Sequence, residues 1–231
     1  MRNDTTNGID LALVLDTTGS MGTHLGEIRR KLVDLVGELS RNFNDLRTGV
    51  VAFKDHDCED YLTKTLEPTG SFARLVDFLS DPALAPGVGG GGAEAVECAL
   101  HELGELSWRP KARKIAILVG DKPPHGAGLD GFSACAHGVD YRDEIEALRL
   151  QGVSVYTVRV GGCLETQRVF EYISARTGGT YLDLLHVRDL PASLVSVCHK
   201  EAGNLGAYRR RLERAGRLTA TRRHLLTALA G

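Results

Sequence analysis

Short apolar runs alternate with longer amphipathic stretches over the first 200 residues of this 231-residue chain. Apolar runs of this length predict buried strands, here at 9–15, 48–53, 114–119, 153–160 and 180–184. An alternating segment at 61–66 predicts an antiparallel edge strand. Helical spacing separates the strands, most clearly at 25–39. The alternation predicts an α/β fold: a doubly wound, mostly parallel, Rossmann-like sheet of six strands with helices on both faces.

Charge divides the chain into two parts. From Lys200 onward there are eight basic and two acidic residues, a net charge of +6, which leaves −8 for the first 199 residues of a chain whose total is −2. We therefore expect one domain over 8–202 and a basic helical tail over 203–231. The tail is either a helix packed on the domain or a binding surface for an acidic partner. We do not expect nucleic-acid binding, although the tail leaves such a contact open.

Cysteine usage and hydropathy indicate the compartment. The five cysteines form an odd set without a CxxC pair, which is typical of reduced thiols. The first eight residues are polar and lack the apolar core of a secretory signal. No stretch approaches the roughly 18 apolar residues that span a bilayer. We expect a cytoplasmic protein with no membrane span.

Three loops are predicted at the carboxyl edge of the sheet, where open parallel sheets bind ligands. The first loop, 16–22, begins with Asp16 and carries Thr18 and Ser20. The second is the glycine run at 87–92, which lacks the lysine of a phosphate-binding P-loop. The third, 120–126, carries Asp121. Two carboxylates and two hydroxyls should therefore meet across one cleft.

The spacing of the first loop suits a hard metal ion. On a turn that leads into a helix, residues at i, i+2 and i+4 can converge on one point, as Asp16, Thr18 and Ser20 would. Their oxygens favour Mg²⁺, Ca²⁺ or Mn²⁺ over zinc. Because the hydroxyls are neutral, the ion would keep the charge needed to attract a carboxylate of a partner. The alternative is structural, with Thr18 or Ser20 as a helix cap.

The pattern Asp16-x-Thr18-x-Ser20 after a hydrophobic strand resembles the metal-ion-dependent adhesion site of the von Willebrand factor A family. Three further segments are similar in sequence to intracellular A domains such as those attached to alpha-kinases. They are residues 47–56, the glycine loop running into 93–96, and residues 121–126. The resemblance covers roughly residues 8 to 200 and does not explain the tail.

This resemblance implies a set of metal ligands and one departure from it. Asp16, Thr18 and Ser20 match the first metal-binding loop of the family, and Asp121 matches the later acidic ligand. The family takes another ligand, Thr or Asp, from the loop before the third helix. Glycine, which we assign to Gly91, stands there in this chain, so that water or the nearby Glu94 would have to replace the missing oxygen.

Two further groups of residues are candidates for ligand contact at the same edge. Asp55 and His56 lie in an acidic run, 54–60, that could rim the cleft and select a basic partner. One histidine and one cysteine do not make a zinc set, so we interpret this run as a solvated turn. His125 follows Pro123-Pro124 and either contacts a ligand or orders its loop.

The function that these observations favour is a metal-dependent protein–protein interaction module rather than an enzyme. By resemblance it would serve as an adaptor in a bacterial intracellular stress, defence, ATPase or kinase-associated system, with a partner Asp or Glu completing the metal shell. A magnesium-dependent hydrolase of the phosphatase type is one alternative, but it needs a second acid where Thr18 stands. A metal-independent scaffold that binds through the tail is the other.

Overall fold

A computed structural model describes residues 8–87, 91–127, 133–183 and 190–230. The described residues form one six-stranded sheet in the order β3-β2-β1-β4-β5-β6. All neighbouring strands are parallel except β2 and β3, which are antiparallel. The strands are β1 (Ile9–Asp16), β2 (Leu46–Phe53), β3 (Thr63–Thr69), β4 (Arg113–Gly120), β5 (Val153–Arg159) and β6 (Tyr181–Asp183). The predicted fold class and the predicted antiparallel edge strand are both confirmed.

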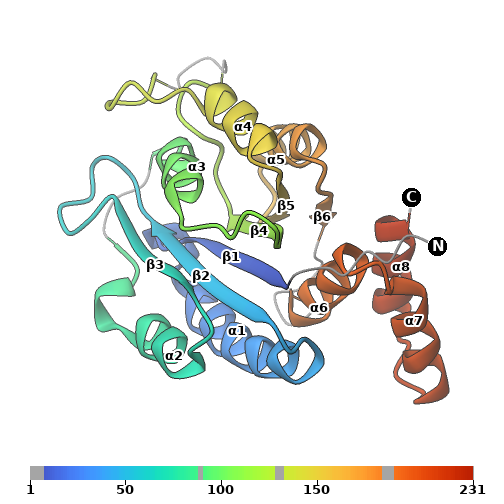
Figure 1. Ribbon diagram of the computed structural model, residues 1–231. Helices are drawn as coiled ribbons and strands as arrows, with labels where there is room; N and C mark the ends of the chain where they lie inside the picture. Colours follow the sequence, from blue (N-terminus) through green and yellow to red (C-terminus); the bar gives the residue numbers. More distant parts are fainter. Residues whose placement is uncertain (1–7, 88–90, 128–132, 184–189, 231) are drawn as a thin grey trace.

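Helices cover both faces of the sheet (Figure 1). On one face lie α1 (Gly22–Asn42), α2 (Phe72–Ser80) and α6 (Leu190–Glu201). On the other face lie α3 (Val96–Glu105), α4 (Tyr141–Leu150) and α5 (Leu164–Thr177). Single-turn 3-10 helices, η1 (Gly19–Met21) and η2 (Pro82–Leu84), precede α1 and follow α2.

The central strand β1 shows why the sheet needs both layers. Every residue from Ile9 to Asp16 is buried. Successive side chains of a strand point to opposite faces: Leu11, Leu13 and Leu15 join the cluster under α1 and α6, whereas Ala12 and Val14 join the cluster under α3, α4 and α5. The sequence of β1 is therefore apolar throughout, as expected for a strand covered on both sides.

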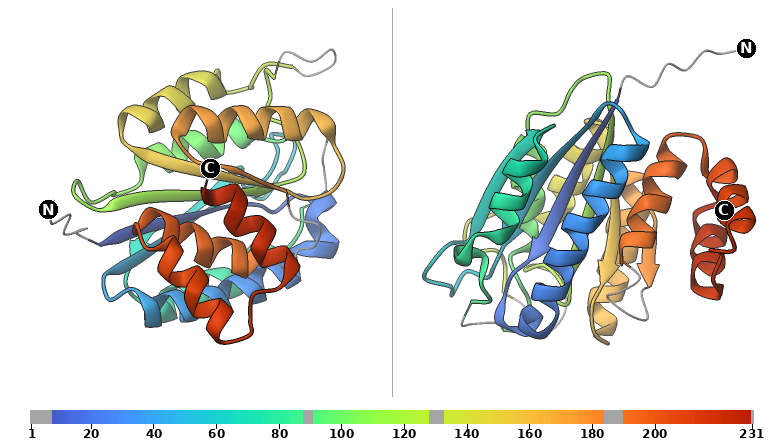
Figure 2. Two further views of the ribbon diagram at one scale, coloured as in Figure 1. Left: turned by 90° about the vertical axis from the view of Figure 1, so that its right-hand side faces the viewer. Right: turned by 90° about the horizontal axis from the view of Figure 1, so that it is seen from below.

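Two helices continue beyond α6 and form the basic tail. They are α7 (Leu205–Arg214) and α8 (Ala220–Ala230), and they stand beside α6 at one edge of the molecule (Figure 2). Their apolar side chains belong to the same hydrophobic cluster as the sheet and α1; these are Tyr208, Leu212, Leu225, Leu226 and Leu229. The tail is thus packed on the domain, while Arg209, Arg210 and Arg214 are exposed. None of the helices described is both long and apolar enough to cross a bilayer.

Candidate functional site

Asp16 and Asp121 meet at the carboxyl ends of β1 and β4. The chain leaves β1 toward β2 on one side and later returns as β4 on the other, and such a switch point is where open α/β sheets bind ligands. Gly120 lets the strands approach here, because a Cβ atom added to it would lie 3.3 Å from Asp16 Oδ2. A larger residue would press on this carboxylate.

The four predicted metal-site residues form one continuous chain of hydrogen bonds. Thr18 Oγ1 donates to Asp16 Oδ1 over 2.6 Å, and the Thr18 backbone N–H donates to the same oxygen over 2.9 Å. The hydroxyls of Thr18 and Ser20 are 3.0 Å apart. Ser20 Oγ donates to Asp121 Oδ1 over 3.1 Å. Asp16 and Thr18 are buried and Ser20 is exposed, so the group opens to solvent on the side of Ser20 and Asp121.

Buried carboxylate oxygens without partners distinguish this site. Among the described residues, Asp16 Oδ2 and both Glu94 carboxylate oxygens are buried with no hydrogen-bond partner. Burial, together with the nearby charge of Asp121, raises the pKa of Asp16 to about 7, although hydrogen bonds from Thr18 act against the rise. Burial and the charges of Asp16, Asp55 and Asp121 raise the pKa of Glu94 to about 9. The nearby charge of Lys122 acts against the rise for Glu94 but does not cancel it.

Glu94 reaches this place from the loop before α3. Its backbone N–H donates to the Pro123 carbonyl over 3.0 Å, and a parallel bridge to Pro124 fixes the loop against the segment after β4. Gly91, earlier in the same loop, is exposed, and a Cβ atom there would meet nothing within 4 Å. Residues 88–90 of the glycine run lie outside the described residues.

The interpretation of 54–60 as a solvated turn is wrong for its first half. Lys54 and Asp55 are buried, and His56 is half-buried, whereas Asp57 and Asp60 are exposed. The Lys54 ammonium pairs with Asp60 and lies 4.4 Å from the centroid of the Tyr61 ring. These contacts bury the start of the segment, which its highly charged sequence did not indicate.

Asp55, His56 and His125 belong to a second polar group beside the first. His125 Nε2 lies 2.7 Å from Asp55 Oδ1, so His125 orders its loop. His56 Nε2 lies 3.0 Å from Oε1 of Glu97. We call His56, Glu97, Cys98 and Cys135 the thiol–imidazole cluster; one ligand atom from each lies within 4.8 Å of the others. Sequence reasoning missed this cluster because its members come from three separate segments.

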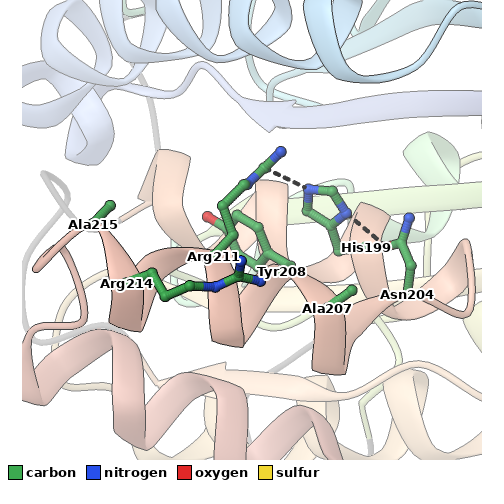
Figure 3. A pocket seen from close by; sticks show the side chains of 7 residues that line it. All are labelled: His199, Asn204, Ala207, Tyr208, Arg211, Arg214 and Ala215. Carbon is green, nitrogen blue, oxygen red and sulfur yellow. Dashed lines mark hydrogen bonds between the residues drawn. The ribbon is translucent and has the colours of Figure 1, made fainter.

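A groove lies where α7 packs beside the end of α6 (Figure 3). It encloses about 570 Å³ and is lined by His199, Asn204, Ala207, Tyr208, Arg211, Arg214 and Ala215. His199 stacks on Tyr208 with centroids 4.2 Å apart, and its Nδ1 lies 2.6 Å from Asn204 Oδ1. Burial lowers the pKa of His199. This histidine is therefore a partnered, structural residue of the groove.

Comparisons with known proteins agree on the fold. The model of the von Willebrand factor type A domain matches residues 10–180. The alpha-protein kinase vwkA of Dictyostelium discoideum is 28% identical over 134 residues, 57% of this chain and 21% of the kinase. A protein of Acanthamoeba polyphaga mimivirus, named as an ariadne-like RING finger protein, is 25% identical over 76% of this chain and 18% of its own length. The chain thus spans about a fifth of these relatives.

A solved structure supports the same architecture. An aerotolerance-related membrane protein from Bacteroides fragilis superposes with a TM-score of 0.56 at 14% identity. The match covers 84% of this chain and all of that one. At this identity the likeness concerns the fold alone.

Proposed function

Since the chain belongs to the von Willebrand factor type A domain family, we propose that it recognises a protein partner through a divalent cation. The cation would be held by Asp16, Thr18, Ser20 and Asp121. Domains of this family commonly mediate protein–protein interaction. The cation would be Mg²⁺, or Ca²⁺ or Mn²⁺, because the donor atoms are carboxylate and hydroxyl oxygens.

The observation that carries this proposal is a pair of buried acids with carboxylate oxygens that lack hydrogen-bond partners in the described part of the chain. Asp16 Oδ2 and the two oxygens of Glu94 have no partner among the described residues. A buried carboxylate without a hydrogen bond or counterion costs several kcal/mol, roughly, in stability. A bound cation would satisfy these oxygens and would reverse the rise in pKa of both acids. The orphaned oxygens thus fit a divalent ion.

The remaining ligands follow from the hydrogen-bonded chain. Thr18 and Ser20 would turn their hydroxyl oxygens to the ion, and Asp121 would bind directly or through water. Glu94 would supply the oxygen that the family takes from the loop before the third helix. Asp16, Glu94 and Asp121 do not close into a three-carboxylate group within 4.8 Å among the described residues, so we assign Glu94 a role through water.

Partner recognition would use the exposed side of the site. Ser20 is exposed and Asp121 is half-buried, so a group from another molecule can reach an ion bound between them. A partner carboxylate is the group that a partly coordinated hard cation attracts most strongly. We therefore infer an adaptor role, and the similarity to an alpha-protein kinase suggests kinase-associated systems as the place to look.

We infer binding rather than catalysis at this site. A phosphatase that uses the aspartate after β1 as a nucleophile requires a general acid two residues on. Thr18 occupies that position, and its hydroxyl donates to Asp16. A magnesium-dependent hydrolase would therefore lack its proton donor. Turnover of a generic phosphoester that Asp16→Asn abolishes would contradict this assignment.

The test combines metal binding with partner capture. Wild type should bind Mg²⁺ in calorimetry, and Glu94→Gln should bind it about tenfold more weakly. The control Glu105→Gln, at an exposed position at the far end of α3, should bind Mg²⁺ as wild type does. Immobilised wild type should retain a partner in Mg²⁺ and release it in EDTA, and Asp16→Ala should retain none. Partner retention unaffected by EDTA and by Asp16→Ala would overturn the proposal.

The tail offers the rival explanation and its own control. Truncation before α7 would remove the leucines of the tail and expose the apolar surface that they cover on the domain. Charge reversal at the exposed Arg210 and Arg214 is therefore the cleaner change. The metal-site proposal expects the partner to stay bound in this double variant. Loss of the partner there, with Asp16→Ala unaffected, would identify a scaffold that binds through its tail.

A further inference from the structure

We propose that the thiol–imidazole cluster is a zinc site, separate from the Mg²⁺ site and distinct in chemistry. Its donors are two thiols, one imidazole nitrogen and one carboxylate oxygen, a mixed set that zinc accepts and that Mg²⁺ and Ca²⁺ do not. The ligands come from the β2–β3 connection, the first turn of α3 and the loop before α4: His56, Glu97, Cys98 and Cys135.

The distances between donors match a tetrahedral shell. With Zn–S of about 2.3 Å and Zn–N of about 2.0 Å, tetrahedral geometry places two sulfurs roughly 3.8 Å apart and sulfur and nitrogen roughly 3.5 Å apart. Cys98 Sγ and Cys135 Sγ are 3.6 Å apart, and Cys135 Sγ lies 3.4 Å from His56 Nε2. Cys98 Sγ lies 3.9 Å from Oε1 of Glu97. The ion could thus enter with small adjustments.

Burial and outer contacts support the same assignment. Glu97 is fully buried, Cys98 and Cys135 are 5% and 8% exposed, and His56 is the ligand nearest to solvent. The second oxygen of Glu97 accepts the backbone N–H of His125 over 3.1 Å. Ligands of structural zinc sites are held by such outer hydrogen bonds. Four protein ligands leave no open position, which favours a structural rather than a catalytic role.

A disulfide between Cys98 and Cys135 is the competing use of the two thiols. The sulfurs would have to close from 3.6 Å to about 2.05 Å. That bond would use only the two thiols, whereas zinc uses all four groups. On zinc binding each thiol releases its proton to solvent, and both become thiolate ligands.

Zinc here would fasten the loop that carries Glu94. Glu97 and Cys98 lie in the first turn of α3, directly after that loop, and Cys135 would tie the loop before α4 to it. We therefore expect zinc to stiffen the wall of the Mg²⁺ site without contacting the Mg²⁺ ion. The zinc site does not depend on the proposed function, since its ligands are different residues.

The experiment uses the full chain, purified in millimolar Mg²⁺ with a phosphine reductant so that the oxygen site is filled. Elemental analysis should give about one zinc per chain. Replacement of zinc by Co²⁺ should give the thiolate charge-transfer band and intense visible bands of a tetrahedral sulfur site. Cys98→Ser and Cys135→Ser should lose both signals, while the matched control Cys163→Ser and the Mg²⁺-site variant Asp16→Ala should keep them.

Two further measurements keep the proposal falsifiable if a cysteine variant folds poorly. The Co²⁺ spectrum of wild type needs no variant, and Glu97→Gln, which preserves shape, should weaken zinc at least tenfold in competition with a chelator. The proposal fails if wild type binds no zinc and gives no charge-transfer band, or if both cysteine variants retain zinc. It also fails if reduced protein refuses zinc and a Cys98–Cys135 disulfide is recovered from cells lysed in alkylating reagent.

Discussion

The central strand β1 carries an aspartate at each end, and the two are treated differently by the fold. Asp10 and Asp16 are both buried, 0% and 1% exposed. Asp10 accepts four hydrogen bonds from the side chains of Arg47 and Arg109 and the Arg109 backbone, at 2.8–3.0 Å. Asp16 accepts bonds only from Thr18, and its second oxygen has no partner among the described residues.

The difference separates a structural carboxylate from a binding one. Burial tends to raise the pKa of Asp10, but the hydrogen bonds and charges of Arg47 and Arg109 outweigh it and hold that pKa below its ordinary value. Burial raises the pKa of Asp16 with no cation to oppose it. The protein thus supplies the positive charge at the amino end of β1, whereas the proposed function would leave it to a bound cation at the carboxyl end.

Removal of Asp10, the aspartate whose oxygens have hydrogen-bond partners, should have the largest effect on stability. Asp10→Ala leaves two arginines, each about a quarter exposed, without their buried partner, and we expect a loss of about 3 kcal/mol in the free energy of unfolding. Urea denaturation measures it. The control Asp45→Ala removes the exposed partner of Arg109 and should cost below about 1 kcal/mol. Mg²⁺ binding by folded Asp10→Ala should be unchanged. Similar losses of stability in Asp10→Ala and Asp45→Ala would show that Asp10 is no more important than a surface partner of Arg109.

Neutralisation of Asp16, at the carboxyl end of β1, should instead raise the stability of the metal-free protein. Asp16→Asn removes a charge that the metal-free protein cannot satisfy, so we expect the metal-free protein to gain about 1 kcal/mol at pH 8. It should also abolish the stabilisation by Mg²⁺, which reaches about 2.7 kcal/mol at a hundredfold excess over Kd in wild type. Thermal unfolding with EDTA and with Mg²⁺ measures both. A destabilised variant that still responds to Mg²⁺ would contradict the comparison.

The pH dependence of stability should reveal the unpartnered acids, Asp16 and Glu94, in the wild-type protein. Because the folded-state pKa values of Asp16 and Glu94 are raised to about 7 and about 9, the folded chain holds more protons than the unfolded chain above pH 4. Metal-free stability should therefore fall as pH rises from 5 to 9, by less than about 1.4 kcal/mol per pH unit for each proton. Bound Mg²⁺ keeps both acids ionised, so its stabilising effect should grow with pH.

The measurement is urea unfolding at pH 5.5, 7 and 8.5, with EDTA or with Mg²⁺. Asp10 does not confound it, since its lowered pKa affects stability only as the pH falls below this window. The double variant Asp16→Asn, Glu94→Gln should show a flatter profile and no gain from Mg²⁺. A Mg²⁺ effect of equal size at all three pH values would show that neither acid binds the ion.

The fold was predictable because its signal is local and repeated. Each strand–helix unit carries its own periodicity, and glycine can end a helix in the left-handed conformation, as Gly178 ends α5 with a φ of 79°. Gly179 is equally constrained, since a Cβ atom there would lie 2.0 Å from the Val155 carbonyl oxygen. The packing of the tail was not predictable, because a basic helix with scattered leucines fits a docked helix and an exposed one alike.

The candidate site was predictable only where its residues follow strands. Asp16 and Asp121 stand directly after β1 and β4, so the topology of a parallel sheet brings them together. The thiol–imidazole cluster has no such signal. Its histidine and its cysteines lie about 40 residues apart in succession, and spacing rules for zinc rely on two ligands within one short turn. The incomplete ligand set of 54–60, with one histidine and one cysteine, also favoured a solvated turn, although Lys54 and Asp55 are buried.

The smallest expected effect tests whether the carboxyl end of β1 can be completed from within the chain. Gly91 is exposed with free space around its Cβ position, and the family resemblance assigns a ligand there, so Gly91→Asp should tighten Mg²⁺ by about threefold, or roughly 0.7 kcal/mol. Gly91→Asn, equal in size but neutral, is the control and should change little. Calorimetry decides the outcome. Tighter binding in both variants would indicate loop stiffening rather than ligation, and no change in either would mean that Glu94 alone serves that side of the ion.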